Sequence, residues 1–336
     1  MNIRSIGSRL GVVSAMLFAA YWGSCVNVAS AQEEVFKGKQ LNFVIRSAAG
    51  GGNDFYGRLV ARHMVKYIPG SPSAIVTNMP GGGGLVAANY IASRARKDGT
   101  EIGVLDRDLA VVQRLGVAAV RFDVRTMIPL GSAASEIYVW VVRPDAGVKS
   151  VAELRNAKKP IRLSGTGAGT TAVQQIVLME RDGFAVNVVT GFSGTSEKVL
   201  AVLRGDVQGT NGTYESLQTA IREEKLHVFA RLGAHPDLKS VPDLRDVLSE
   251  KMRPVGVMMA ASLDSGRPFY LPPGVPDANV KILRSAFEKA LSDPELLKEA
   301  DRAKQSIDFI SGEQVHKGNL EVLGSSDDVV SLFKAL

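Results

Sequence analysis

The chain has 336 residues, of which 45% are hydrophobic and 22% charged, and its mean hydropathy is +0.06. These values are typical of a folded protein, with room for two domains, and exclude a disordered or fibrous one. The net charge is +6, and its two signs are mixed along the chain without a basic stripe, which argues against a nucleic-acid-binding protein.

The first 31 residues have the order of a secretory signal peptide. Arg4 and Arg9 precede an uncharged, mostly apolar stretch over 10–22, and an A-x-A cleavage site ends at Ala31. The apolar stretch is shorter than the ~20 residues that span a bilayer, so a membrane anchor is the weaker interpretation. We therefore expect residues 1–31 to be removed during export.

The only cysteine, Cys25, lies in this leader. The residues before it, 22–24, are a poor match to a lipoprotein signal, so we expect no lipid attachment there. A mature chain without a thiol has no disulfides, no cysteine nucleophile and no cysteine-ligated metal.

Strand and helix patterns alternate from residue 41 onward. The expected strands are 41–45, 74–78, 101–105, 138–142, 161–164 and a buried one at 185–190, and the expected helices are 55–68, 85–96, 170–182 and one that ends near 204. Ser150 and Glu153 predict a capping box for a short helix. After residues 272–276 the chain is mostly helical, with helix starts at Asp293 and Ser311. This alternation predicts an α/β fold with largely parallel sheets.

Three glycine-rich turns, 48–53, 80–84 and 165–169, each follow an expected strand and precede an expected helix. Backbone N–H groups and a helix N-terminus converge there, which makes such a turn a natural anion site. Glycine also lets a ligand approach the backbone closely. Any one of them could be an ordinary tight turn, but three in one chain favour a ligand. Asp54, after the first turn, is expected to favour the helix dipole.

Known cofactor and enzyme motifs are missing. The only Gly-Lys pair, 38–39, lacks the Ser or Thr of a phosphate-binding loop. Residues 167–172 satisfy G-x-G-x-x-A, but the acidic residue that a dinucleotide site needs is absent before Glu197. There is no G-x-S-x-G and no H-E-x-x-H, and the four histidines are interpreted as solvated or satisfied side chains. We expect no cofactor, no metal and no enzymatic activity.

Several motifs follow one another in an order that resembles a known family. They are A-G-G-x-x-D at 49–54, N-x-P-G-x-G-G at 78–84, G-x-G-x-G-[ST] at 165–170 and P-x-G-x-P at 272–276. The chain resembles the solute-binding proteins of tripartite tricarboxylate transporters, also called Bug-type receptors, over about 40–315.

Three departures from the family's motifs bear on the ligand. Asn53 stands where the family usually has Ser or Thr, and Ala172 and Val173 lie near the place of a frequent His. Residues 191–193 replace a usual loop that carries an aromatic residue and a lysine. These changes affect the expected ligand more than the expected fold.

The resemblance implies a two-domain type II periplasmic-binding-protein fold, the Venus flytrap, with a ligand cleft between the domains. The implied divisions are a signal peptide over 1–31, domain I over 32–135, domain II over 136–240, and the rest of domain I over 241–336. Residues 131–137 and 231–243 are the expected hinges.

The resemblance also implies a small carboxylate that lies against the first-domain turns and is covered by second-domain turns. The implied ligand-binding residues are Ala49, Gly50, Gly51, Gly52, Asn53, Asp54, Gly81, Gly82, Gly83, Gly84, Gly167, Gly169, Thr170, Thr171, Ser193, Gly194 and Thr195. Arg107 and Arg267 are the candidates for direct charge pairing. Arg107 is expected to end the strand at 101–105, where an α/β sheet places its ligands.

The expected function is that of a periplasmic receptor. It would capture a small organic anion by domain closure and deliver it, as a monomer, to the membrane permease of a tripartite transporter. A secreted hydrolase or isomerase on the same scaffold is the first alternative, and a ligand sensor for a signalling partner is the second.

Overall fold

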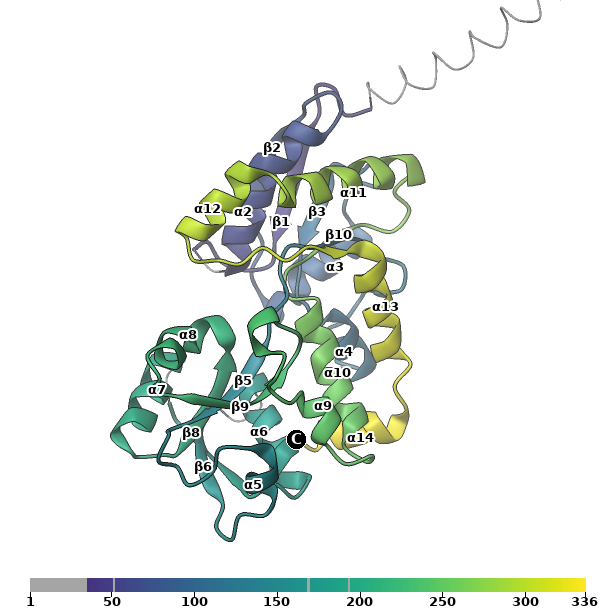
Figure 1. Cartoon of the computed structure of the whole chain (residues 1–336). Helices are drawn as coiled ribbons and strands as arrows, with labels where there is room; N and C mark the ends of the chain where they lie inside the picture. Colours follow the sequence, from purple (N-terminus) through teal and green to yellow (C-terminus); the bar gives the residue numbers. More distant parts are fainter. Residues whose placement is uncertain (1–34, 51, 168–169, 193) are drawn as a thin grey trace, which may run out of the picture.

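The computed structural model describes residues 35–50, 52–167, 170–192 and 194–336. The expected signal peptide therefore lies outside the described residues, as do Gly51, Gly169 and Ser193. Figure 1 shows two lobes, each built around one sheet. No helix in these ranges is long and apolar enough to cross a membrane.

The first sheet has the strand order β11-β4-β10-β3-β1-β2. Its strands are β1 (Gln40–Ile45), β2 (Ser73–Asn78), β3 (Glu101–Val104), β4 (Ile128–Ser132), β10 (Pro268–Leu271) and β11 (Ile310–Ser311). Strand β1 is parallel to β2 and β3, whereas β10 runs antiparallel to β3 and β4, and β11 antiparallel to β4.

The second sheet has the order β7-β6-β8-β5-β9. Its strands are β5 (Tyr138–Val142), β6 (Ile161–Ser164), β7 (Val186–Val189), β8 (Gly209–Thr213) and β9 (His227–Leu232). Strand β6 is parallel to β7 and β8, but β5 is antiparallel to both of its neighbours. Both sheets are therefore mixed, and the prediction of largely parallel sheets is wrong, because β5 and β10, the strands that follow the two crossings, and β11 run against the βαβ units.

The helices of the first half of the chain are α2 (Gly52–Met64), η1 (Val65–Tyr67), η2 (Gly82–Gly84), α3 (Leu85–Ser93), α4 (Leu109–Arg114) and α5 (Val151–Arg155). Those of the second half are α6 (Thr171–Arg181), α7 (Thr195–Arg204), α8 (Tyr214–Arg222), η3 (Pro236–Leu238), α9 (Leu244–Val247), α10 (Arg253–Asp264), α11 (Asp277–Leu291), α12 (Pro294–Arg302), α13 (Gly312–Leu323) and α14 (Asp327–Lys334).

Local signals in the sequence account for several helix starts. Asp293 caps α12 by accepting from the Glu295 N–H at 2.8 Å, and Ser311 forms a full capping box with Gln314, so both predicted starts are confirmed. The capping box predicted at Ser150 is only half formed. Its hydroxyl accepts from the Glu153 N–H, but the Glu153 carboxylate accepts from Lys149 N–H instead.

The strand predicted as buried at 185–190 is an edge strand. Only Val186 of β7 is fully buried, and Asn187 is exposed, because β7 pairs with β6 alone. Its run of valines reflects the β propensity of an edge strand rather than burial on both faces.

The chain crosses between the sheets twice. It leaves the first sheet through 133–137, between β4 and β5, and returns through 265–267, between α10 and β10. The two crossing segments are hydrogen-bonded to each other, since Ala133 N–H donates to the Arg267 carbonyl and Arg267 N–H to the Ala134 carbonyl, both at 3.0 Å. The first expected hinge therefore coincides with a crossing. The second, 231–243, does not.

Residues 231–243 stay with the second sheet. Arg231 forms an isolated parallel bridge with Asp243, and the guanidinium of Arg231 lies 2.7 Å from the Asp243 carboxylate. Both side chains are largely buried. This segment is thus fixed by a buried ion pair and does not connect the two lobes.

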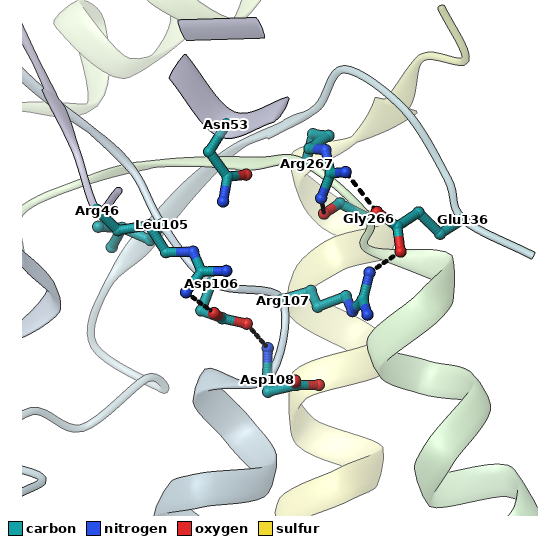
Figure 2. A pocket seen from close by; sticks show the side chains of 9 residues that line it. All are labelled: Arg46, Asn53, Leu105, Asp106, Arg107, Asp108, Glu136, Gly266 and Arg267. Atoms are coloured by element: carbon teal, nitrogen blue, oxygen red, sulfur yellow. Dashed lines mark hydrogen bonds and ion pairs between the residues drawn. The ribbon is translucent and has the colours of Figure 1, made fainter. Parts of the chain in front are cut away.

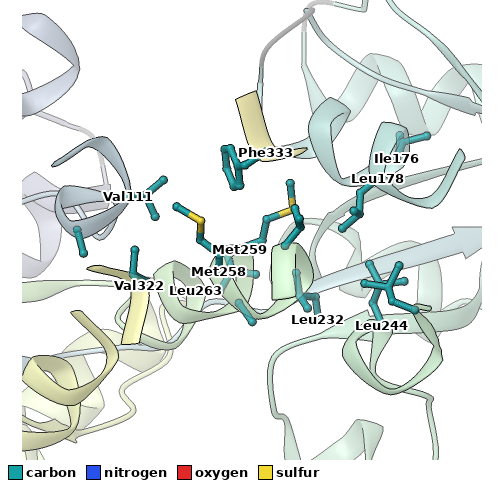
Figure 3. Packing of buried hydrophobic residues seen from close by; sticks show 14 of the residues in the cluster. Val111, Ile176, Leu178, Leu232, Leu244, Met258, Met259, Leu263, Val322 and Phe333 are labelled. Atoms are coloured by element: carbon teal, nitrogen blue, oxygen red, sulfur yellow. The ribbon is translucent and has the colours of Figure 1, made fainter. Parts of the chain in front are cut away.

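One apolar cluster extends from the first lobe into the second, and we call it the apolar bridge (Figure 3). It joins Val111 of α4 to Ile176 of α6 through Leu263 of α10 and Phe333 of α14. Helix α10 packs against α6, α9, α13 and α14. A separate core fills the space between the first sheet and α2 and α11. The domain boundaries stay a prediction.

Candidate functional site

The two glycine turns of the first lobe lie at one edge of its sheet. Strands β1, β2 and β3 are parallel, and their carboxyl ends lead into α2, α3 and α4. The two crossing segments meet the sheet at the same edge, because Phe269 of β10 is paired with Val104, the last residue of β3. Ligands of α/β proteins bind at such an edge.

Asp54 organises the first glycine turn. Its carboxylate accepts from the Gly50 N–H at 2.9 Å, from Arg58 Nε at 3.0 Å and from Asn78 Nδ2 at 2.8 Å. Burial alone would raise the pKa of Asp54, but these hydrogen bonds and the Arg58 charge outweigh it and lower the pKa to about 2. The Asp54 carboxylate thus holds the first glycine turn to Arg58 and Asn78.

The second glycine turn is joined to Arg46, which follows β1. All four glycines from Gly81 to Gly84 have positive φ, which favours glycine. A Cβ on Gly84 would lie 2.8 Å from Arg46 Cδ, and Arg46 Nη1 donates to the Gly83 carbonyl at 3.0 Å. The same guanidinium forms an ion pair with Asp106, which follows β3. The second glycine turn therefore packs closely against the Arg46 side chain.

A cavity of about 190 Å³, the charged cavity, lies where these elements meet (Figure 2). Its lining combines the ends of β1 and β3 with the start of α2 and both crossing segments. The lining residues are Arg46, Asn53, Leu105, Asp106, Arg107, Asp108, Glu136, Gly266 and Arg267. Of the predicted ligand-binding residues, the structure places Asn53 and Arg107 in this lining, together with the second candidate arginine, Arg267.

Glu136 connects the two candidate arginines (Figure 2). One carboxylate oxygen pairs with Arg107 Nη1, and the other lies 2.5 Å from Arg267 Nη2. The exposed fractions of these side chains are 15% for Arg107, 12% for Glu136 and 22% for Arg267. Arg107 lies in the turn between β3 and α4, beyond the strand that it was expected to end. Neither arginine is a free surface charge.

Burial and neighbouring charges shift the pKa values of two groups in this lining. Burial lowers the pKa of Arg267, and the neighbouring Arg107 charge lowers it further. Burial and the neighbouring Asp106 raise the pKa of Asp108. Among the described residues, Nε of Arg46 and Nε of Arg267 are buried donors without a hydrogen-bond partner. Two unused donors on cavity-lining side chains are consistent with an acceptor supplied by a ligand.

A second cavity of about 360 Å³, the neighbouring cavity, shares Glu136 and Arg267 with the first. Its lining extends to Tyr56 of α2 and to Thr213 and Glu215 at the end of β8 and the start of α8. The Arg267 guanidinium lies over the Tyr56 ring, 5.6 Å from its centroid. Residues from both lobes thus line this cavity. Neither lining contains a histidine or a cysteine among the described residues, so neither offers an imidazole base or a thiol nucleophile.

The predicted second-lobe turns lie at the edge of the second sheet that faces the first lobe. Thr213 at the end of β8 pairs with Tyr138 at the start of β5, directly after the first crossing. Because β6, β7 and β8 are parallel, the turns after β6 and β7 lie at that edge. Thr170 directly precedes α6, with its hydroxyl donating to the Gly167 carbonyl rather than capping the helix, and Gly194 precedes α7. The described members of this set, Gly167, Thr170, Thr171, Gly194 and Thr195, line neither of the two cavities above.

Lys198, a residue that the sequence analysis did not select, lies buried behind these turns. Only 2% of it is exposed, and its ammonium donates to the Asn211 carbonyl at 2.6 Å. Within the described ranges, no carboxylate is paired with it. Burial lowers the pKa of Lys198 to about 8.

One cluster has the composition of a metal site, away from both cavities. His63, Asp293 and Glu295 offer ligand atoms within 4.8 Å of one another. The ammonium of Lys66 lies 2.7 Å from the Glu295 carboxylate and 3.3 Å from His63 Nδ1, so a cation of the chain already occupies this position. The cluster fits a structural contact between α2 and α12.

Comparison with known proteins identifies the family of this chain. Residues 57–317 match the model of a family described as the tripartite tricarboxylate transporter family receptor. The chain belongs to this family. Its members are receptors, which agrees with the expectation that the chain is not an enzyme.

Individual relatives agree with the family and the fold. A protein of the UPF0065 group from Bordetella pertussis is 25% identical over 279 residues, which cover 79% of this chain and 80% of the relative. A TctC solute-binding protein from Polaromonas, solved without ligand, superposes with a TM-score of 0.72 at 22% identity, over 89% of this chain and 99% of that one. A Rhodopseudomonas palustris protein solved with adipate gives 0.56 at 17% identity, over 88% and 97%. The two-domain solute-receptor fold is thereby confirmed.

Proposed function

We propose that this protein is a periplasmic receptor that binds a small carboxylate between its two lobes and delivers it to the permease of a tripartite transporter. The supporting observation is the charged cavity, in which three arginines meet at the carboxyl edge of the first sheet beside both crossings. Binding of adipate by a relative of the same fold agrees with this ligand class.

The ligand-binding residues are proposed in two groups. Asn53, Arg46 and Arg267 would contact the ligand from the first lobe and the crossings, while Asp54 and the glycines of the first two turns hold these side chains in place. Thr170, Thr171, Gly194 and Thr195 would contact it from the second lobe after closure. Closure requires that the ligand bind the closed form more tightly than the open form, and contacts from both lobes supply that difference.

A thermal-shift screen tests this proposal. Mono-, di- and tricarboxylates are added to the mature protein, and a ligand at about 100 times its Kd should stabilise the fold by about 2.7 kcal/mol. Mass spectrometry should recover the bound compound unchanged. If the compound were converted at a catalytic rate, the hydrolase or isomerase alternative would replace the receptor.

A further inference from the structure

Glu136 is held at a fixed place between the lobes. Its backbone N–H donates to the Leu263 carbonyl of α10 at 3.0 Å. The opposite crossing segment approaches so closely that a Cβ on Gly266 would lie 2.3 Å from the Ala134 carbonyl and 3.0 Å from the Glu136 nitrogen. The backbone on both sides of Glu136 is therefore tightly packed, and its side chain enters the charged cavity from a rigid base.

The Glu136 carboxylate is bound in the way that a ligand carboxylate would be. One of its oxygens accepts from the Arg107 guanidinium, and the other forms an ion pair with the Arg267 guanidinium. Charge-assisted hydrogen bonds to arginine are the strongest that a carboxylate finds in a protein. A side chain of the receptor itself thus fills the position between the two arginines.

The charges that line the cavity nearly cancel. Three arginines face three acidic residues, Asp106, Asp108 and Glu136. If all three acids are ionised, the lining is neutral. If Asp108, whose carboxyl is buried beside Asp106, holds a proton, the lining has one excess positive charge. The side chains of the lining thus supply counter-charge for at most one ligand carboxylate and in neither state for two, and an unpaired buried charge is costly.

We propose that Glu136 is a specificity-determining residue that occupies the carboxylate position between Arg107 and Arg267, so that the cavity accepts ligands with a single carboxylate and rejects di- and tricarboxylates. This inference rests on the proposed function only in taking the charged cavity as the ligand site. It assigns Glu136 a role beyond structure, because its negative charge, and not only its shape, determines which ligand binds.

The first experiment uses inorganic sulfate, a dianion. The natural ligand does not have to be identified for this experiment. Thermal unfolding of the mature protein is followed during a sulfate titration at constant ionic strength. In Glu136→Gln, the two arginines lose their internal partner, so sulfate should stabilise the fold saturably, at a concentration about 10- to 100-fold lower than any effect on wild type. The matched control is Glu313→Gln. It removes a surface carboxylate of α13 that pairs with Arg284 of α11, and it should behave as wild type.

A conservative variant separates charge from packing. Glu136→Asp retains the negative charge on a shorter side chain, so it should still reject sulfate even if it unfolds at a lower temperature. A purely structural Glu136 would instead give two destabilised variants, neither of which gains sulfate binding, and that result would overturn the proposal.

The second experiment compares adipate with its monoamide, which has the same length but one carboxylate, by calorimetric titration. Wild type should bind the monoamide more tightly, and Glu136→Gln should shift the preference toward adipate by about 10- to 100-fold. A wild-type protein that binds a dicarboxylate at least as tightly as its monoamide would overturn the role of Glu136 and leave the receptor function standing. If no carboxylate binds any form, the proposed function fails, and the sulfate titration still decides about Glu136.

Discussion

The two lobes are joined by two contacts of opposite character. The apolar bridge through α10 and α14 is continuous, and Leu263 is fully buried in it (Figure 3). Beside it, the crossing segments and the charged cavity bring together buried ions and two unused guanidinium donors. Close-packed apolar contacts resist deformation, whereas a hollow polar contact can close around a solute. We therefore expect the lobes to pivot about the apolar bridge, and the charged cavity to narrow around the ligand when they close.

The largest expected effect comes from breaking the apolar bridge. Leu263→Ala removes a fully buried side chain and should lower the free energy of unfolding by about 2–5 kcal/mol, measured by denaturant titration. Leu283→Ala, in the separate core of the first lobe, is the matched control and should cost a similar amount. Only Leu263→Ala should change the ligand-induced closure. Equal ligand-induced closure in both variants would contradict the role of the apolar bridge as the pivot.

The next effect concerns the charged cavity. Arg107→Ala leaves Glu136 with one arginine and makes the lining more negative, so binding of a carboxylate should weaken by about 2–5 kcal/mol in a calorimetric titration. Arg107→Lys should recover part of this loss, because it restores the charge without the planar fork. An affinity of Arg107→Ala within error of wild type would exclude Arg107 from the site.

The contribution of Asp54 to stability should depend on pH. Its folded pKa of about 2 lies below its ordinary value of 3.8, so its contribution to stability is present above pH 4 and is lost as the pH falls toward 2. Asp54→Asn should cost about 1.5–3 kcal/mol at pH 7 and progressively less below pH 4. Asp123→Asn, whose carboxyl also has a pKa lowered to about 2, is the control. It should lose stability similarly but keep ligand affinity, whereas Asp54→Asn should lose both.

The smallest expected effect comes from Lys198, which should lower the stability of the fold rather than raise it. The pKa of Lys198 is lowered in the fold, so the unfolded chain binds the proton more tightly, and Lys198 should become less destabilising as the pH rises from about 8 to 10.5. Lys198→Met should raise Tm at pH 7 by roughly 1–4 °C, and this advantage should shrink at pH 10. A lower Tm for Lys198→Met at pH 7 would show that the ammonium is compensated in the fold.

The sequence predicted the βαβ units well because their signals are local. Alternating apolar residues, glycine turns and caps such as Asp293 and Ser311 determine elements without reference to distant parts of the chain. Two of the missed strands lack such signals, whereas β9 (HVFARL) and β10 (PFYL) have apolar and aromatic residues and were overlooked. Strand β8 reads GTNGT, without a large apolar residue, and β4 contains Pro129 and Gly131. Their pairing partners lie far away in the chain, so only the folded topology shows that they are strands.

The site was predictable in part for the same reason. Arg107 and Asn53 could be selected because they follow expected strands and turns, as do Arg46 and Asp106, which were overlooked although their positions after β1 and β3 carried the same signal. Glu136 had no such signal. Its role depends on a contact with Arg267, 131 positions later in the chain, which forms only where the two crossing segments pair.

Small-angle scattering with and without ligand tests the central claim, that a carboxylate closes two lobes around the charged cavity, most directly. The mature protein is measured alone and with a saturating amount of the carboxylate that the thermal-shift screen identifies, alongside Arg107→Ala at the same ligand concentration. We expect a smaller radius of gyration for the wild type on addition of ligand, and a weaker response in the variant. Saturable binding that leaves the wild-type radius of gyration unchanged would contradict it.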